Sequence, residues 1–243
     1  MKQQRLWVGF LLIVGGWLCL DLVIQGPMIP GILGTLITLG KLLISGELVR
    51  HTVYSLYRLT TAIGLALVVG TLTGVVMGMS PKIESVFAPF VYVMFPVPKA
   101  ALLPILFVFF GLGDLSKIVL IYLILYFQIT LAVYDAVKGI PKAIFLSAST
   151  IQLKGLKLYK HVVFPAILPS VFTALRVSVG IGIAVLFFAE TYATNVGLGY
   201  FIMNQWSLLN YEAMYAGILL LGALGYVIFR GIDIVRYKLV RWT

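Results

Sequence analysis

Residues 59–79 read LTTAIGLALVVGTLTGVVMGM, a run of 21 residues without a charged side chain. A helix needs roughly 20 apolar residues to cross about 30 Å of hydrocarbon, so this run predicts a membrane-spanning helix. Gly70, Gly74 and Gly78 recur at every fourth position and therefore lie on one face of that helix. Small residues at this spacing allow a second helix to approach closely, so we expect this face to pack against another span.

The composition of the 243-residue chain extends this prediction beyond one helix. Apolar residues make up 61% of the sequence and charged residues 11%, and the mean hydropathy is +1.08. Soluble domains are about half apolar and about a quarter charged, so the composition excludes an ordinary soluble fold. The net charge of +10 comes from cations placed between the apolar runs. This placement is typical of topology signals at a membrane surface and does not indicate a nucleic-acid-binding face.

Further apolar runs predict about six transmembrane helices in an all-α membrane protein. The first run follows a basic start, but Trp17 and Leu18 beside Cys19 do not fit the small-residue cleavage rule of signal peptides, so we interpret it as an uncleaved span. We expect residues 25–58 to contain a helix at the outer surface and residues 190–210 to form a loop. The six predicted spans are residues 6–24, 59–79, 85–110, 118–137, 162–189 and 211–229.

The distribution of Lys and Arg predicts the orientation of these spans. With an internal N-terminus, eleven cations fall on the cytoplasmic side and three on the outer side, as the positive-inside rule requires. We therefore expect both termini to be cytoplasmic. Residues 1–243 are predicted to form one transmembrane domain, with a first span and outer-surface helix in residues 1–58, a core in residues 59–235 and a cytoplasmic loop at residues 138–161. The outer cations are Lys41, Arg50 and Lys117, and the inner ones are Lys2, Arg5, Lys82, Lys138, Lys142, Lys154, Lys157, Lys160, Arg236, Lys238 and Arg241.

The third predicted span is interrupted by Pro89, Pro96, Pro98 and Pro104. An internal proline removes a backbone hydrogen bond and clashes with the preceding turn, so this span cannot be a straight helix. Non-helical backbone at membrane depth is tolerated only against protein or a water-filled cavity, which favours this span as a wall of a solute pathway. Lys99 near its middle either offers a counter-charge to an anionic solute or pairs with a carboxylate or backbone carbonyls. The pathway candidates in this span are Pro96, Pro98, Lys99 and Pro104.

Two further ionisable residues lie in and after the fifth predicted span. Arg176 lies 11 residues after Pro165, which is about 16 Å along a helix and close to mid-depth. Glu190 lies 14 residues further on, about 21 Å away, so the two side chains cannot pair within one helix. We expect each of them either to pair with another element or to line the pathway, and Arg176 and Glu190 are therefore further pathway candidates. Gly197 and Gly199 predict a tight outer turn before Tyr200, with contact to the substrate as the alternative.

The predicted cytoplasmic loop contains the most specific pattern in the chain. Ser147-Ala148-Ser149-Thr150-Ile151-Gln152-Leu153 is followed by Phe164-Pro165-Ala166-Ile167-Leu168-Pro169. This arrangement resembles the cytoplasmic signature of ABC importer permeases, in which Glu-Ala-Ala, three residues and Gly precede a Leu-Pro by a fixed gap. In that frame, Leu146 occupies the position of the glutamate and Gln152 that of the glycine.

Five other motifs resemble the nitrate, sulfonate and taurine branch of that family. They are FPVPKAALLP at residues 95–104, FGLGDLSK at residues 110–117, ALR at residues 174–176, AE at residues 189–190 and GLGY at residues 197–200. The resemblance implies a type I ABC importer permease fold that works as a dimer in a bacterial inner membrane. Two ATP-binding subunits would lie inside and a substrate-binding protein outside. ATP and Mg²⁺ would be bound by the ATP-binding subunits, so no cofactor is expected in this chain.

The same resemblance implies that the cytoplasmic loop couples the chain to the ATP-binding subunits. The segment is rich in small residues, carries lysines at both ends and connects two spans directly, which suits a docking role. The coupling residues implied by the signature are Ser147, Ala148, Ser149, Thr150, Gln152, Leu153, Lys154 and Gly155.

The sequence offers no motif for catalysis or metal binding. Gly40-Lys41-Leu42 lacks the glycine spacing and the hydroxyl of a phosphate-binding loop, and the two histidines are predicted on opposite sides of the membrane. We therefore expect a transport subunit that is not an enzyme. The resemblance points to a small anion, such as a sulfonate or nitrate, as the solute. The alternatives are an ABC importer for a neutral or aromatic nutrient such as a thiamine precursor, an ion-gradient-driven secondary transporter and a membrane-embedded enzyme.

Overall fold

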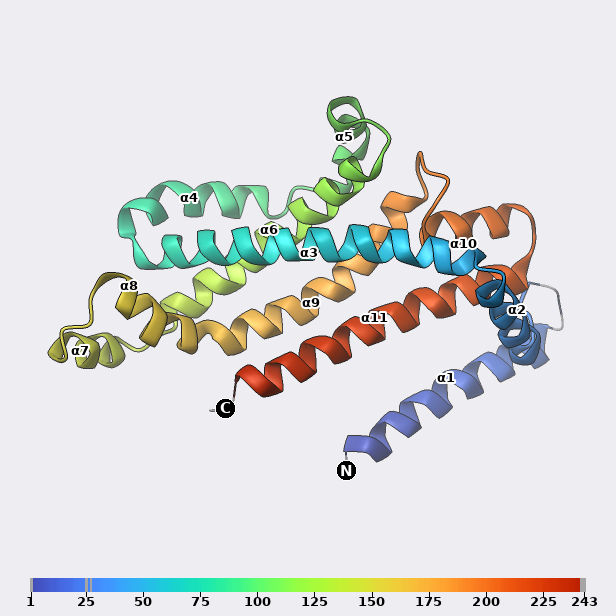
Figure 1. The fold of residues 1–243 in the computed structure, drawn as a ribbon, viewed down its shortest axis with the longest axis horizontal. Helices are drawn as coiled ribbons and strands as arrows, with labels where there is room; N and C mark the ends of the chain where they lie inside the picture. The colour runs from blue at the N-terminus through green and yellow to red at the C-terminus, as the bar shows by residue number, and fades with distance from the viewer. Residues whose placement is uncertain (1, 25, 27, 241–243) are drawn as a thin grey trace. The chain divides into compact units, whose positions relative to one another are not determined.

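The computed structural model describes residues 2–24, 26 and 28–240, and these residues form helices joined by short connections (Figure 1). Two compact units can be distinguished among them: one combines Met1–Ser55 with Glu190–Ala223, and the other combines Leu56–Ala189 with Leu224–Thr243. The predicted all-α fold is confirmed. In chain order the elements are α1 (Lys2–Ile24), α2 (Ile32–Ile44), α3 (Glu47–Met79), α4 (Pro81–Met94), η1 (Lys99–Leu102), α5 (Leu103–Phe110), α6 (Asp114–Lys138), α7 (Lys142–Thr150), α8 (Gly155–Leu158), η2 (Tyr159–Val163), α9 (Phe164–Glu190), α10 (Leu198–Ser207) and α11 (Tyr211–Leu239).

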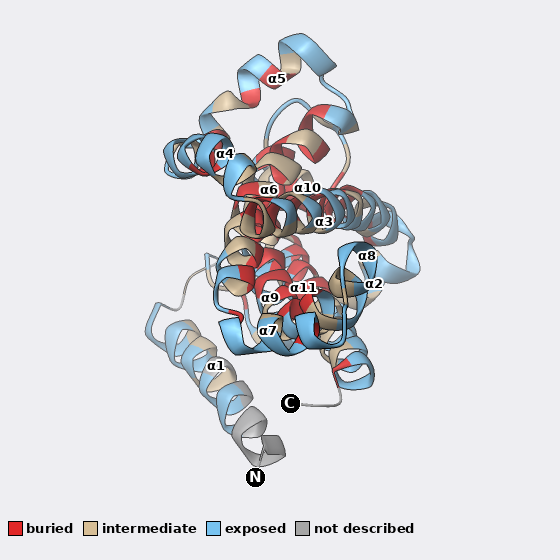
Figure 2. Ribbon diagram, turned by 90° about the vertical axis from the view of Figure 1, so that its left-hand side faces the viewer, coloured by how far each residue is buried: buried red, intermediate tan, exposed pale blue. Residues whose placement is uncertain are grey.

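The glycine face of α3 packs against α6 in the second unit. A Cβ atom added at Gly74 would lie 2.7 Å from the carbonyl oxygen of Thr130 and 2.8 Å from Cβ of Val133, so a larger residue would push the helices apart. Gly70 and Gly78 approach α6 in the same way. The hypothesis of a packing face is confirmed. Figure 2 shows the buried residues of this unit concentrated along α6 and α9.

The third predicted span is broken, but only two of its four prolines lie at the break. α4 and the η1–α5 segment are bent by 84°, and Pro96 and Pro98 lie between them. Pro89 lies inside α4 without ending it. Pro104 occupies the first turn of α5, where the missing N–H costs no intrahelical hydrogen bond. The span is therefore interrupted between α4 and η1, where Pro96 and Pro98 lie, and not at Pro89 or Pro104.

The predicted cytoplasmic loop is largely helical. It contains α7 and α8, which are separated by residues 151–154, and η2 is a π-helical turn that leads from α8 directly into α9. α9 continues to Glu190 with Pro169 in its interior. The fifth predicted span is therefore extended toward its N-terminus by a continuous helical path.

In the first unit, the surface helix expected in residues 25–58 is replaced by two elements. α2 ends at Ile44, Gly46 has a positive φ of 80°, and α3 begins at Glu47, twelve residues before the predicted span. The indole N–H of Trp17 donates to the carbonyl of Pro30 at 3.0 Å, which ties α1 to the segment before α2. Polar side chains at the start of α3 did not end the helix, because its backbone hydrogen bonds need no apolar side chains.

The predicted loop at residues 190–210 is wrong for residues 198–207, which form α10. Leu198, Phe201, Ile202 and Gln205 are buried and recur at the i, i+3, i+4 and i+7 positions of one helical face. The two glycines that suggested a turn lie at the beginning of this helix.

Four helical stretches in the described part of the chain are long and apolar enough to cross a membrane: α3, α6, Gly155–Glu190 and α11. The bent pair of α4 and η1–α5 provides a fifth span if it is counted as one. The first predicted span coincides with α1, which includes the apolar stretch Val14–Ile24, and several side chains nearer its N-terminus lie outside the described part. α11 continues well beyond the predicted end because Arg230 and Asp233 are accommodated within the helix.

Candidate functional site

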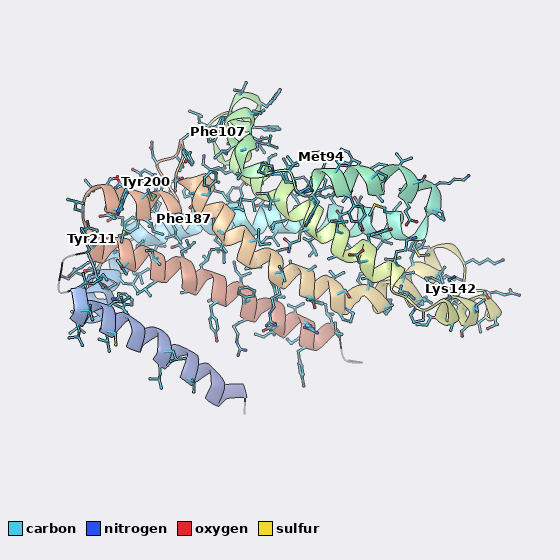
Figure 3. The ribbon with its side chains drawn as sticks, turned by 180° about the vertical axis from the view of Figure 1, so that it is seen from behind. Met94, Phe107, Lys142, Phe187, Tyr200 and Tyr211 are labelled. Atoms are coloured by element: carbon cyan, nitrogen blue, oxygen red, sulfur yellow. The ribbon has the colours of Figure 1, made fainter. Side chains whose placement is uncertain are left out.

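The predicted coupling residues are concentrated on α7 and the four residues after it. Figure 3 shows Lys142 of α7 at one end of the second unit, whereas Phe107 of α5 lies toward the opposite end of α6. α7 follows α6 after three residues, and α8 and η2 connect it to α9. α7 is therefore joined by short connections to two spans.

α7 ends in two backbone hydrogen bonds that place Gln152 in the left-handed region. The N–H of Gln152 donates to the carbonyl of Ser149 at 3.0 Å, and the N–H of Leu153 donates to that of Ala148 at 3.0 Å. This is the Schellman arrangement of helix ends, in which the residue at positive φ is usually glycine. Gln152 has a φ of 57° and occupies the glycine position of the signature. The backbone turn of the signature is thus formed without its glycine.

The surface of this segment combines small polar residues with exposed apolar ones. Ser147, Ser149 and Thr150 donate their hydroxyl groups to carbonyls of α7 itself, at 2.6 to 3.0 Å. Ala148 is buried and Leu153 is half-buried, whereas Gln152, Lys154 and Gly155 are exposed. Three large apolar side chains also point outward: the exposed fractions are 67% for Leu146, 69% for Ile151 and 83% for Leu156.

Lys99 binds the backbone at the break of the third predicted span. It is 6% exposed, and its Nζ donates to the carbonyls of Met94 at 2.6 Å, Phe95 at 2.9 Å and Val97 at 3.3 Å. The ammonium group also lies 4.7 Å from the centre of the Phe127 ring on α6. These contacts match the structural alternative for Lys99, because its N–H groups bind backbone carbonyls at and just after the end of α4.

A second buried lysine, Lys117, was missed as a site residue by the sequence analysis. Its Nζ donates to the carbonyls of Leu112 at 2.9 Å and Gly113 at 3.2 Å, in the connection after α5. Arg58 of α3 donates to Asp114 at the start of α6, through Nε at 2.8 Å and Nη2 at 2.6 Å. Arg58 and Lys117 are almost fully buried. The FGLGDLSK motif contained the signal, since an acid at the first helical position and a lysine three residues later follow directly after a glycine-containing turn.

Arg176 pairs with Asp233 on α11, within the second unit. Arg176 lies near the middle of α9 with 47% of its side chain exposed. An exposed cation at this position of a membrane helix is costly against lipid, so this face requires a polar environment or a second protein surface.

Glu190, the last residue of α9, is fully buried. Its carboxylate accepts from the hydroxyl of Ser55 at 2.8 and 2.9 Å and from the N–H of Gly199 at 2.9 Å. A side chain at Gly197, where φ is 127°, would collide with this carboxylate. As predicted, Glu190 and Arg176 do not pair with each other, and each has a partner on another element.

A family described as the binding-protein-dependent transport system inner membrane component matches residues 62–241 of the chain. A putative ABC transporter permease protein of Methanocaldococcus jannaschii is 32% identical over 87% of this chain and 76% of its own length. The taurine transport system permease protein TauC of Escherichia coli K12 is 28% identical over 79% of this chain and 70% of its own. The putative aliphatic sulfonates transport permease protein SsuC of Bacillus subtilis is 27% identical over 90% of this chain and 80% of its own.

Two solved structures of the MetNI methionine ABC transporter in inward-facing conformations have a similar fold. Their TM-scores are 0.67 and 0.69, with 21% and 18% sequence identity, and each match covers 79% of this chain and 95% of the other.

Proposed function

The chain belongs to the family of binding-protein-dependent transport system inner membrane components, and we propose that it forms the solute pathway of an ATP-driven importer and couples that pathway to separate ATP-binding subunits through α7. It is a multi-pass inner-membrane transport subunit.

The exposed surface of α7 and residues 151–156 is the observation that carries this proposal. Leu146, Ile151 and Leu156 expose large apolar side chains beside lysines that follow α7. Apolar residues surrounded by charged ones are typical of protein–protein contacts. The hydroxyl groups of Ser147, Ser149 and Thr150 already donate to carbonyls within α7. A partner can therefore approach the helix closely without leaving those groups unpaired.

The mechanism we infer is alternating access. ATP binding would draw the two ATP-binding subunits together and move α7 with them. Because α7 is joined to α6 by a three-residue connection and to α9 by α8 and η2, this movement would be transmitted to both spans. The Schellman turn after α7 resists unwinding and so favours movement of the segment as a unit.

Arg176 is the strongest residue candidate for contact with a solute. The N–H groups of Lys99 are directed at backbone carbonyls, whereas Arg176 is half exposed at the middle of a span. A cation at this position supports a small anion, such as a sulfonate or nitrate, as the solute, and the names of two relatives support the same class. An ABC importer for a neutral or aromatic nutrient is the alternative, with Arg176 then serving only to pair with Asp233.

The remaining parts of the assembly follow from the family. We propose that two copies of this chain enclose the pathway, that α7 and both termini face the cytoplasm, and that two ATP-binding subunits holding ATP and Mg²⁺ dock there. A substrate-binding protein would deliver the solute from the opposite side. The requirement of Arg176 for a non-lipid environment supports a pathway or a second copy against this face of α9.

Reconstitution tests the proposal. The purified chain in liposomes should hydrolyse no ATP, and solute uptake should require ATP-binding subunits, ATP and a loaded binding protein. Uptake that persists after ATP depletion but collapses with a proton uncoupler would instead identify an ion-gradient-driven transporter. Robust ATP hydrolysis by the chain alone would overturn the assignment.

A further inference from the structure

Three consecutive backbone amides at the start of α10 donate to side chains from two other elements. The N–H of Gly197 donates to Nδ1 of His51 at 3.0 Å, that of Leu198 to Oγ of Ser55 at 2.8 Å, and that of Gly199 to Oε2 of Glu190 at 2.9 Å. His51 and Ser55 lie one turn apart on α3, and Glu190 ends α9. All six residues belong to the first unit.

These three acceptors replace the capping residue that α10 lacks. The first N–H groups of a helix have no intrahelical partners, and a side chain at the N-cap position usually accepts from one of them. The N-cap residue of α10 is Gly197, which has no side chain. Ser55 and Glu190 are fully buried and also bond to each other, so they hold the second and third amides in a fixed geometry. His51 supplies the remaining acceptor.

His51 can accept this hydrogen bond only while its ring is neutral. Nδ1 accepts from Gly197, so the ring proton of the neutral form resides on Nε2. Protonation adds a hydrogen to Nδ1, which then faces the N–H of Gly197 as a second donor. It also places a positive charge at the positive end of the helix dipole. The ring packs on Tyr200 and Phe201 with centroids 5.9 and 5.3 Å apart, so it cannot turn away without losing these contacts.

The charged groups around His51 come from each element packed on it. Glu47 and Arg50 lie on the same helix as His51 and carry opposite charges. Glu190 lies beyond Ser55 at the end of α9, and Tyr200 is the titratable residue on α10. The unperturbed pKa of histidine is about 6.5, so measurements above and below this value compare the neutral ring with the protonated one.

We propose that His51 is a positioning residue that holds the beginning of α10 only in its neutral form, so that acidification releases this end of the helix. Ser55 and Glu190 continue to hold the next two amides, which confines the release to the first turn. Any effect of this release on transport rests on the proposed function, in which α10 is part of a permease that changes conformation. The release itself is a property of this chain alone and can be measured without transport.

Backbone hydrogen exchange of the full chain in detergent at pH 7.5 and 5.5 tests the proposal. Peptides that cover residues 195–201 are compared with peptides that cover Leu209 and Asn210, whose backbone bonds at the other end of α10 involve no histidine. The ratio of the two exchange rates removes the effect of pH on intrinsic exchange. In the wild type we expect this ratio for residues 195–201 to be roughly five- to tenfold higher at pH 5.5 than at pH 7.5, since one hydrogen bond is lost. His51→Asn carries an oxygen in place of Nδ1 that does not protonate, so it should remain protected at both pH values.

Two further variants complete the test. His51→Leu should exchange fast at both pH values, and His161→Asn, which changes the other histidine of the chain, should behave as the wild type. A wild type without pH dependence at residues 195–201, or a pH dependence that disappears in His161→Asn and persists in His51→Asn, overturns the proposal. If the exchange results hold but reconstituted uptake shows no dependence on His51, the positioning role stands and only its link to the proposed function fails.

Discussion

The N–H of Leu153 donates to the carbonyl of Ala148 at 3.0 Å and closes α7 around Gln152, which adopts a φ of 57°. This contact preserves the turn of the permease signature although the signature glycine is absent. The turn separates α7 from α8, which leads through η2 into α9. Its residues therefore give the sharpest tests of the coupling segment.

Gln152→Gly should stabilise the chain. A residue with a Cβ atom is strained in the left-handed region by roughly 1–2 kcal/mol, and glycine is not, although its unfolded state is more flexible. We expect the free energy of unfolding to rise by up to about 1 kcal/mol, measured as a higher melting temperature in detergent. Gln152→Ala is the matched control because it retains the Cβ atom, and an equal rise in both variants would show that backbone strain is not the cause.

Lys99→Met should destabilise the chain without changing solute specificity. The carbonyls of Met94, Phe95 and Val97 would lose a charged donor, and a hydrogen bond to a charged group contributes roughly 1.5–3 kcal/mol. Thermal unfolding measures the loss, and Lys82→Met on the exposed face of α4 is the control. An unchanged melting temperature together with weaker uptake of an anionic solute would instead indicate that Lys99 lines the pathway.

Substitutions of Arg176 and Asp233 should have opposite effects on the concentration of an anionic solute that gives half-maximal uptake. Arg176→Met removes a charged donor, and since such a hydrogen bond contributes roughly 1.5–3 kcal/mol, half-maximal uptake should need about tenfold more solute. Asp233→Asn removes the competing carboxylate, so half-maximal uptake should need less solute. Arg230→Met, on the exposed face of α11, is the control. Parallel losses in both variants of the pair would indicate a purely structural salt bridge.

Features that depend on local periodicity were predictable from the sequence. Gly70, Gly74 and Gly78 identified the packing face of α3 because helical spacing alone places them together. The same rule would have identified α10, but its two initial glycines were interpreted as a turn and outweighed the apolar pattern of Leu198 and Phe201. The apolar spacing was the stronger signal in this segment.

Partners that are distant in the sequence could not be predicted in the same way. Ser55 and Glu190 are 135 residues apart, and no local pattern connects them. Lys99 is different, because its acceptors lie within five residues of it, yet its charge suggested a solute contact. The positions of the coupling and pathway residues follow from the fold, whereas their roles in coupling and solute contact stay predictions.

Coupling through α7 is tested most directly by Gln152→Arg in liposomes that contain the full importer. Gln152 is exposed, and Arg occupies the left-handed region at the same cost as Gln, so insertion and melting temperature should match the wild type. We predict that ATP-dependent uptake falls by at least about tenfold, as expected when a bulky charge costs a protein contact roughly 1.4 kcal/mol or more. Lys82→Glu, a charge change on α4, should retain uptake. Unchanged uptake by Gln152→Arg would contradict the account and place the coupling contact elsewhere.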